Sequence, residues 1–88
     1  MNKCVKITVT VESLSEFLHE IIKPHARSMD LEGLVQPVGT VQARIIACGS
    51  KEKVDAFVEL LQKEALMDIE IEPFIKDKDY RGVFRVIE

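Results

Sequence analysis

Cysteine, proline, glycine and aromatic residues are all scarce in this sequence of 88 residues. Its two cysteines are too few for the disulfide framework that stabilises many small secreted domains. There is no internal repeat or low-complexity stretch, and no apolar run reaches the roughly 20 residues of a membrane-spanning helix. The first residues alternate between polar and apolar types, unlike a signal peptide. The sequence therefore predicts a cytoplasmic protein without a membrane segment.

Neither sign of charge is in large excess. The chain has 12 basic and 15 acidic residues, which gives a formal net charge of -3. Nonspecific binding to nucleic acid needs a basic surface, so this balance argues against it. Hydrophobic residues make up 47% of the chain, which is ordinary for a globular protein. The length allows one small domain, and we expect residues 1–88 to form it.

Strands are predicted where apolar residues alternate with polar ones or gather in short runs. The predicted strands are residues 4–11, 33–37, 41–48, 67–73 and 82–87. A charged loop is expected at residues 76–81. Pro37 cannot donate a hydrogen bond to a neighbouring strand, so we expect it at a sheet edge or a strand end.

Two helices are predicted from apolar residues at a spacing of three or four. Ser13 and Glu16 have the spacing of a capping box, in which each side chain binds the other residue's amide. Pro24 lies inside this first helix and lacks an amide proton, so we expect a kink or a short break there. Ser50 is placed to cap the second helix. The predicted core face of that helix is Val54, Phe57, Val58 and Leu61.

The elements follow the order strand, helix, strand, strand, helix, strand, with one further strand at the end. This order predicts the α+β, ferredoxin-like fold, an antiparallel sheet with two helices packed on one face. Residues 26–35 resemble the acylphosphatase pattern A-x-x-L-G-L-x-G-x-V, and residues 47–57 resemble its pattern A-x-G-x-x-x-x-V-x-x-F. The spacing between the two segments matches without a gap, and residues 83–86 resemble the final F-x-I strand. The resemblance implies the acylphosphatase type of this fold.

What the resemblance implies about function is hydrolysis of the carboxyl-phosphate bond of acyl phosphates, without metal or cofactor. The site of that family combines a glycine-bearing loop after the first strand, an arginine at the start of the first helix and an asparagine ending the second strand. The loop amides and the guanidinium hold the phosphate. The asparagine orients the attacking water.

This chain departs from the family at each of those three parts. The arginine position falls on His19, and no arginine precedes Arg27. The asparagine position falls on Pro37, which has no hydrogen-bonding side chain. The phosphate loop corresponds to a segment without glycine, in which two carboxylates would repel an anion. The residues in the place of that loop are Glu12, Ser13, Leu14, Ser15 and Glu16.

These departures favour a non-catalytic acylphosphatase-like module that binds a protein partner or a small anionic ligand, as a monomer or weak dimer and without a cofactor. The alternative is a divergent acylphosphatase that seats phosphate on the amides from Ser13 to Phe17, with His19 and Arg44 supplying charge. A further alternative on the same fold is a regulatory domain of the ACT type, which binds ligands at the seam between two paired domains.

The sheet face away from the helices is a separate candidate surface. Its predicted residues are Lys6, Thr8, Thr10, Gln42, Arg44 and Arg85. Open sheets of this plan sometimes bind RNA with stacked aromatic side chains. Residues 4–11 and 41–48 contain no aromatic side chain, so a solvated face fits better. A partner-protein face is the intermediate interpretation, with Ile46 as an apolar contact.

The sulfurs of the two cysteines could be close, because their strands are expected to be antiparallel neighbours. We interpret Cys4 and Cys48 as small, inert, reduced residues rather than a redox pair. His19 and His25 are six residues apart and do not share a helix face, so no metal site is predicted. The acidic residues that alternate within 67–73 are interpreted as protection of a sheet edge against aggregation.

Overall fold

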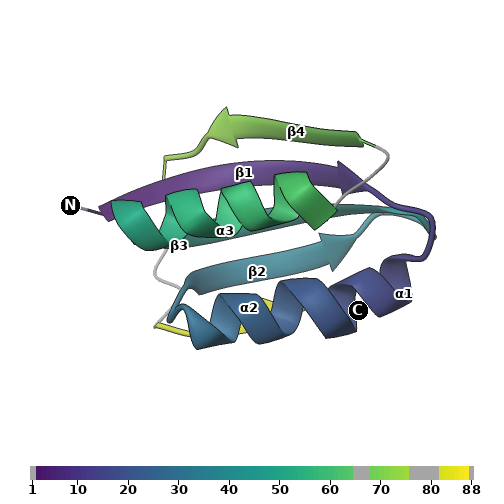
Figure 1. The fold of residues 1–88 in the computed structure, drawn as a ribbon, viewed down its shortest axis with the longest axis horizontal. Coiled ribbons are helices and arrows are strands. Elements are labelled where there is room, and N and C mark those ends of the chain that lie inside the picture. Colours follow the sequence, from purple (N-terminus) through teal and green to yellow (C-terminus); the bar gives the residue numbers. More distant parts are fainter. Residues whose placement is uncertain (1, 65–67, 76–81, 88) are drawn as a thin grey trace.

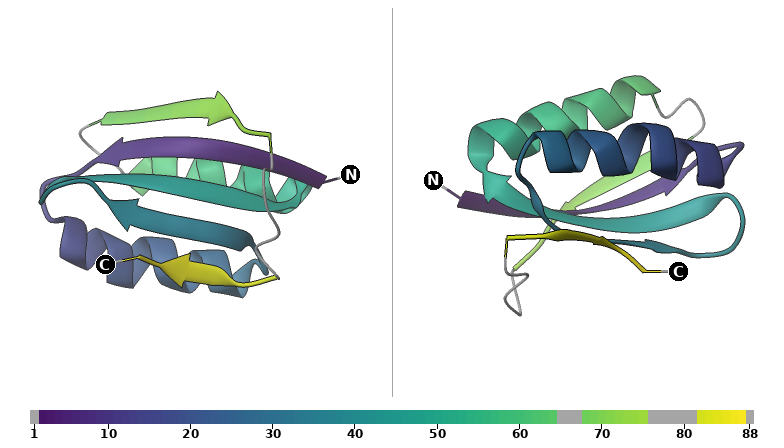
Figure 2. Two further views of the ribbon diagram at one scale, coloured as in Figure 1. Left: turned by 180° about the vertical axis from the view of Figure 1, so that it is seen from behind. Right: turned by 90° about the horizontal axis from the view of Figure 1, so that it is seen from below.

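The computed structural model describes residues 2–64, 68–75 and 82–87. One five-stranded sheet in the order β4-β1-β3-β2-β5 carries the helices on a single face (Figures 1 and 2). The strands are β1 (Asn2–Thr10), β2 (Glu32–Pro37), β3 (Gln42–Ser50), β4 (Asp68–Pro73) and β5 (Phe84–Val86). The helical segments are α1 (Leu14–Phe17), η1 (Leu18–Ile22), α2 (Lys23–Ser28) and α3 (Lys51–Glu64).

The predicted ferredoxin-like fold is confirmed, with one difference in the sheet. β1 pairs antiparallel with β3 and with β4, and β2 pairs antiparallel with β3. β5 pairs parallel with β2. The sheet is therefore mixed. Pro37 ends β2, an inner strand, so it stands at a strand end rather than a sheet edge. Met67 and the predicted loop at 76–81 lie outside the described residues. Over the part of the chain that is described, no helix has the length and apolar character needed to cross a membrane.

The hydrophobic core lies between the helices and one face of the sheet. The two central strands, β1 and β3, contribute every second residue to it. These residues are Val5, Ile7 and Val9 in β1 and Ala43, Ile45 and Ala47 in β3. From the helix side, Phe57 is fully buried, and its ring meets that of Phe84 edge to face at 6.4 Å between centroids. β5 is thereby packed into the same core as α3.

The segments α1, η1 and α2 follow one another without a gap and together form the first helix, so the break predicted at Pro24 is absent. η1 is a π turn, in which the amide of Lys23 donates to the carbonyl of Leu18 five residues earlier. Pro24 then stands in the first turn of α2. Pro24 has no amide proton to donate to the preceding turn, and the wider π turn lies where the regular hydrogen-bond pattern would otherwise be interrupted. The irregularity predicted at Pro24 is thus a π turn rather than a break, and a kink there stays a prediction.

The predicted capping box is not formed. Ser13 is the N-cap of α1, but its side chain makes no capping hydrogen bond. Only its backbone carbonyl takes part, accepting from the amide of Phe17 at 3.1 Å. Ser13 and Glu16 are both exposed, so water can solvate their polar groups. The first-turn amides of α1 are consequently left without a side-chain cap.

The end of α2 holds an aspartate in a backbone conformation that favours glycine. Asp30 has a φ of 54°. The amide of Leu31 donates to Ala26 at 3.0 Å and that of Asp30 to Arg27 at 3.1 Å, which is the Schellman arrangement. Asp30→Gly is therefore expected to raise the free energy of unfolding by about 1 kcal/mol, measured by urea denaturation.

A control is needed because Asp30→Gly also removes an ion pair. Its carboxylate lies 3.9 Å from the ammonium of Lys53, and the Asp30 side chain is 88% exposed. An exposed pair of this length contributes little. Lys53→Met should therefore change the stability by less than Asp30→Gly does. A less stable Asp30→Gly variant would contradict the prediction.

Ser50 caps the start of α3, as the sequence predicted. The Ser50 hydroxyl accepts from the amide of Lys53 at 3.3 Å. One turn later, Asp55 accepts from Lys3 at 2.6 Å and from Lys51 at 2.9 Å. The two ammonium groups lower the pKa of the Asp55 carboxyl below its usual range. Asp55 thereby links α3 to the beginning of β1.

Candidate functional site

A pocket of about 440 Å³ opens between the first helix and the turn that follows β2. We call it the His19 pocket. Its described lining residues are Leu14, Ser15, Leu18, His19, Pro37, Gly39 and Thr40. The structure therefore brings together the two positions, His19 and Pro37, that the sequence spacing assigns to the arginine and the asparagine of the acylphosphatase site.

Each wall of the pocket is held by local backbone structure. His19 is exposed and belongs to the π turn η1. Pro37 is the last residue of β2, and the turn after it is closed by a 2.7 Å hydrogen bond from the Val38 amide to the Gln42 carbonyl. Gly39 has a φ of 88°, which a glycine adopts without strain. The pocket is thus built on a helix start and a tight turn.

The polar groups of the pocket suit an anion only in part. The uncapped amides at the start of α1 are donors at the positive end of a helix. His19 is the titratable side chain among the described lining residues, which include no arginine or lysine. Leu14, Leu18 and Pro37 contribute apolar surface, and Ser15 and Thr40 contribute hydroxyl groups. This arrangement can hold a small ligand, but it lacks the guanidinium that binds phosphate in acylphosphatases.

The predicted anion loop is divided between two hollows. Leu14 and Ser15 line the His19 pocket, whereas Glu12, Ser13 and Glu16 line a separate hollow of about 240 Å³. Two further carboxylates, Glu20 and Glu64, also line that second hollow. The repulsion expected from Glu12 and Glu16 therefore acts mainly on a neighbouring surface. Among the described lining residues of the His19 pocket there is no carboxylate.

Arg44 does not belong to the His19 pocket. It is an exposed residue of β3, in the row that contains Thr8 and Gln36. Side chains of this row face away from the helices, because the alternate residues Ala43 and Ile45 are buried beneath them. The role given to Arg44 in the hydrolase alternative therefore has no support in its position.

The sheet face without helices, which we call the open face, carries the predicted polar residues together with carboxylates. β4 is an edge strand, as expected, and its acidic residues are direct partners of β1 residues. The pairs are Lys6 with Glu72, Thr8 with Glu70, and Thr10 with Asp68. Carboxylates beside Lys6 weaken the attraction of this face for RNA. Leu34 and Ile46 are half-buried partners on the same face, and a protein partner there stays a prediction.

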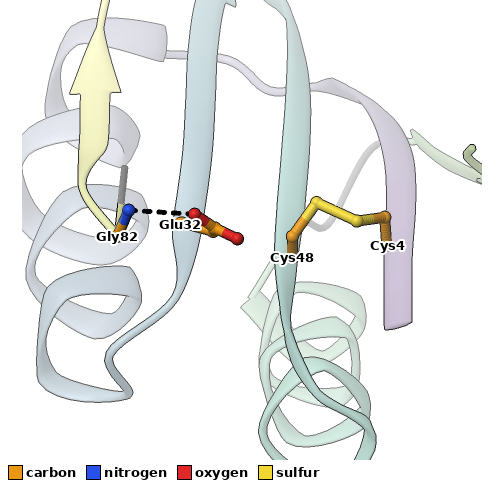
Figure 3. The surroundings of a disulfide bond; sticks show 4 residues. All are labelled: Cys4, Glu32, Cys48 and Gly82. Carbon is orange, nitrogen blue, oxygen red and sulfur yellow. Dashed lines mark hydrogen bonds between the residues drawn. A yellow bond between two sulfur atoms is a disulfide. The ribbon is translucent and has the colours of Figure 1, made fainter. Parts of the chain in front are cut away.

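The interpretation of the cysteines as reduced residues is wrong, because Cys4 and Cys48 form a disulfide (Figure 3). They are direct partners of β1 and β3, with Cα atoms 4.1 Å apart. Cys4 directs its carbonyl toward the amide of Phe74 at 3.2 Å, on the β4 side. The two cysteines therefore form a non-hydrogen-bonded pair, the closer kind in an antiparallel ladder. Disulfides are typical of oxidising compartments, and the cytoplasmic location stays a prediction.

His25, the second histidine, makes a hydrogen bond within the first helix. The ring Nδ1 of His25 lies 2.8 Å from the carbonyl oxygen of Ile21, as expected for an N–H donor. Over residues 2–64, 68–75 and 82–87, no group of three histidine, cysteine, aspartate or glutamate side chains gathers in a way that suits a metal ion.

Comparison with solved structures relates the fold to acylphosphatases. The chain resembles an acylphosphatase from Coxiella burnetii with a TM-score of 0.81 and 22% identity, over 98% of this chain and 93% of the other. It resembles the acylphosphatase from Bacillus subtilis with a TM-score of 0.79 and 17% identity, over 100% of both chains. Full-length HypF matches with a TM-score of 0.81 and 14% identity, over 100% of this chain and 12% of that one.

The comparisons at the level of sequence found no counterpart. No protein-family model and no curated protein sequence matches the chain. The structural matches nevertheless extend along almost its whole length. The resemblance predicted from the two sequence segments is thereby confirmed for the fold, and this chain has the fold of the acylphosphatases.

Proposed function

We propose that this chain is a binding module on the acylphosphatase fold, without acyl phosphate hydrolysis, and that the His19 pocket binds a small ligand with an anionic group and an apolar body. One observation carries the proposal. The pocket combines His19 and uncapped helix amides with Pro37, where the water-orienting asparagine would stand.

Hydrolysis in acylphosphatases uses an arginine and an asparagine, which the described lining residues of the pocket do not include. A transferring phosphoryl group must be held by fixed positive charge, and the attacking water must be oriented by a hydrogen bond. Removing one such donor from an enzyme typically costs about 10²–10³ in rate. Pro37 cannot orient water through its side chain, and His19 is a weaker anion partner than a bidentate guanidinium. Both losses in one site leave little rate enhancement.

Ligand binding needs a cavity of suitable size with apolar and hydrogen-bonding groups, and the His19 pocket has these. Its volume of about 440 Å³ lies within the range of small-molecule sites, roughly 300–1,000 Å³. Leu14, Leu18 and Pro37 offer apolar contact, and the hydroxyls of Ser15 and Thr40 offer hydrogen bonds. An anionic group would approach the amides of α1 and His19. This combination favours a small organic anion over free phosphate.

The first test is hydrolysis of benzoyl phosphate by the purified chain. We expect a rate within about twofold of the uncatalysed reaction, because the described lining residues include neither an arginine nor an asparagine. The His19→Ala variant is the control and should give the same rate. Turnover well above background that falls in His19→Ala would overturn the proposal.

The second test measures binding with benzoate and phosphate as separate probes in an NMR titration. Benzoate should shift the amide signals of residues 14–19 and 37–40 at lower concentration than phosphate does. The Leu18→Ala variant should weaken benzoate binding and leave phosphate binding unchanged. If neither anion moves these signals, the His19 pocket is not a ligand site.

A divergent acylphosphatase is the second candidate, favoured by the uncapped amides beside His19. It requires the His19 side chain to take the place of the guanidinium, so turnover of benzoyl phosphate would lie well above background and would fall in the His19→Ala variant. The binding module has no turnover to lose.

A further inference from the structure

We propose that the Cys4–Cys48 disulfide is a thiol–disulfide exchange site, which small thiols and dithiols open in the folded protein by attack on the sulfur of Cys4. The proposal concerns the open face and is independent of the His19 pocket. It begins from the position of the bond. Cys4 and Cys48 lie in the rows of β1 and β3 that face away from the helices, next to the pair formed by Lys6 and Ile46.

The two sulfurs differ in access. Cys4 is partly exposed, whereas Cys48 is 2% exposed. A thiolate must approach a disulfide along the S–S axis, from the side opposite the leaving sulfur. Attack on Cys4 therefore comes from the side of β4, and attack on Cys48 comes from the side of β2. The burial of Cys48 favours the first of these approaches.

A neighbouring side chain restricts the approach to Cys48 as well. Glu32 is the direct partner of Cys48 on β2 and lies on the far side of Cys48 from Cys4 (Figure 3). One carboxylate oxygen of Glu32 accepts a hydrogen bond from the Gly82 amide at 2.9 Å, which holds the side chain in place. The Glu32 side chain therefore occupies the side from which a thiolate would have to approach Cys48.

The exchange itself is a balanced two-electron reaction. The thiolate of the incoming thiol forms a bond to Cys4 Sγ, the Sγ–Sγ bond breaks, and Cys48 leaves as a thiolate that takes a proton from water. With a dithiol, its second thiolate attacks the mixed disulfide and releases Cys4. The dithiol is then oxidised to its disulfide, and both cysteines are reduced.

The sheet keeps the reduced cysteines together, so the reaction is reversible without unfolding. The pair is flanked in the β1–β3 ladder by Lys3 with Gly49 and by Val5 with Ala47. These neighbours hold the two Cα atoms opposite each other whether or not the sulfurs are joined. Reoxidation by a small disulfide can therefore close the same bond from either cysteine.

The test follows reduction of the oxidised full chain by dithiothreitol under native conditions, with alkylation and mass measurement at each time. We expect the rate to rise in proportion to the dithiothreitol concentration and to exceed the unfolding rate measured for the same chain. A rate that levels off at the unfolding rate would overturn the proposal, because the bond would then open only in unfolded molecules.

The point of attack is tested with reduced glutathione, acid quenching and peptide mapping. The glutathione adduct should lie on Cys4 rather than Cys48 by a ratio of about tenfold or more. In the Glu32→Ala variant, which removes the side chain from the approach to Cys48, the share on Cys48 should rise about threefold. Adduct mainly on Cys48 in the natural chain would refute attack on Cys4, and an unchanged ratio in Glu32→Ala would refute the role of Glu32.

Discussion

Loss of the Cys4–Cys48 disulfide is expected to lower the free energy of unfolding by about 4 kcal/mol. The bond joins residues separated by 44 positions. A loop of this length loses considerable chain entropy in the unfolded state when its ends are joined. The melting temperature should fall by roughly 16–30 °C in a domain of this size. Urea denaturation of the Cys4→Ala/Cys48→Ala double variant against the oxidised chain measures the effect.

Two features of that experiment distinguish the entropic effect from simple loss of packing. The double variant should have a larger m-value, because its unfolded state is more expanded. Dithiothreitol should destabilise the natural chain and leave the double variant unchanged. A difference in unfolding free energy below about 1 kcal/mol would contradict the prediction.

Gly33→Ala is expected to destabilise the protein by about 4 kcal/mol or more, enough to leave much of it unfolded. Gly33 has a φ of 140°, and a Cβ built there would overlap the carbonyl oxygen of Ile46 and lie 2.8 Å from the carbonyl carbon. Both atoms belong to the backbone of β3, so no side chain can rotate away. β2 and β3 would have to separate at the centre of the sheet. Circular dichroism and urea denaturation measure the loss.

Gly39→Ala is the matched control. Gly39 also has a positive φ, of 88°, but a Cβ there meets no atom within 4 Å. It should therefore lose only about 1 kcal/mol from backbone strain. If the two variants were equally stable, the close approach of β2 to β3 would not be the reason for the glycine.

The order and bounds of most elements could be predicted, because the spacing of apolar residues within a strand or helix shows which side of that element faces the core. The alternation in β1 and the helical spacing of Val54, Phe57 and Leu61 are of this kind. The direction of β5 could not be predicted in the same way. Its three residues pair with β2 because β4 already covers the free edge of β1, and this depends on the whole sheet. The π turn before Pro24 is likewise a rearrangement of the backbone that residue preferences do not encode.

The sequence identified two residues of the candidate site, but it did not show which other side chains surround them. Counting residues from the two acylphosphatase-like segments assigned His19 and Pro37 to the arginine and asparagine positions, and the structure places both in one pocket. The separation of Glu12 and Glu16 from the His19 pocket depends on how the first turn of α1 is rotated. The predicted strand pairing allowed Cys4 and Cys48 to be close, and the structure makes them direct partners. Their oxidation depends on the compartment, which the sequence does not state.

The strand order also has a consequence during synthesis. β4 and β5, the two outer strands, leave the ribosome after β1, β2 and β3, which are complete before residue 51. Until the last strands arrive, β1 and β2 are the edges of a three-stranded sheet with unpaired backbone groups and a β-branched face. Such edges associate with other nascent chains. A slow passage through residues 51–86 would therefore be the step at which this protein is most exposed to aggregation.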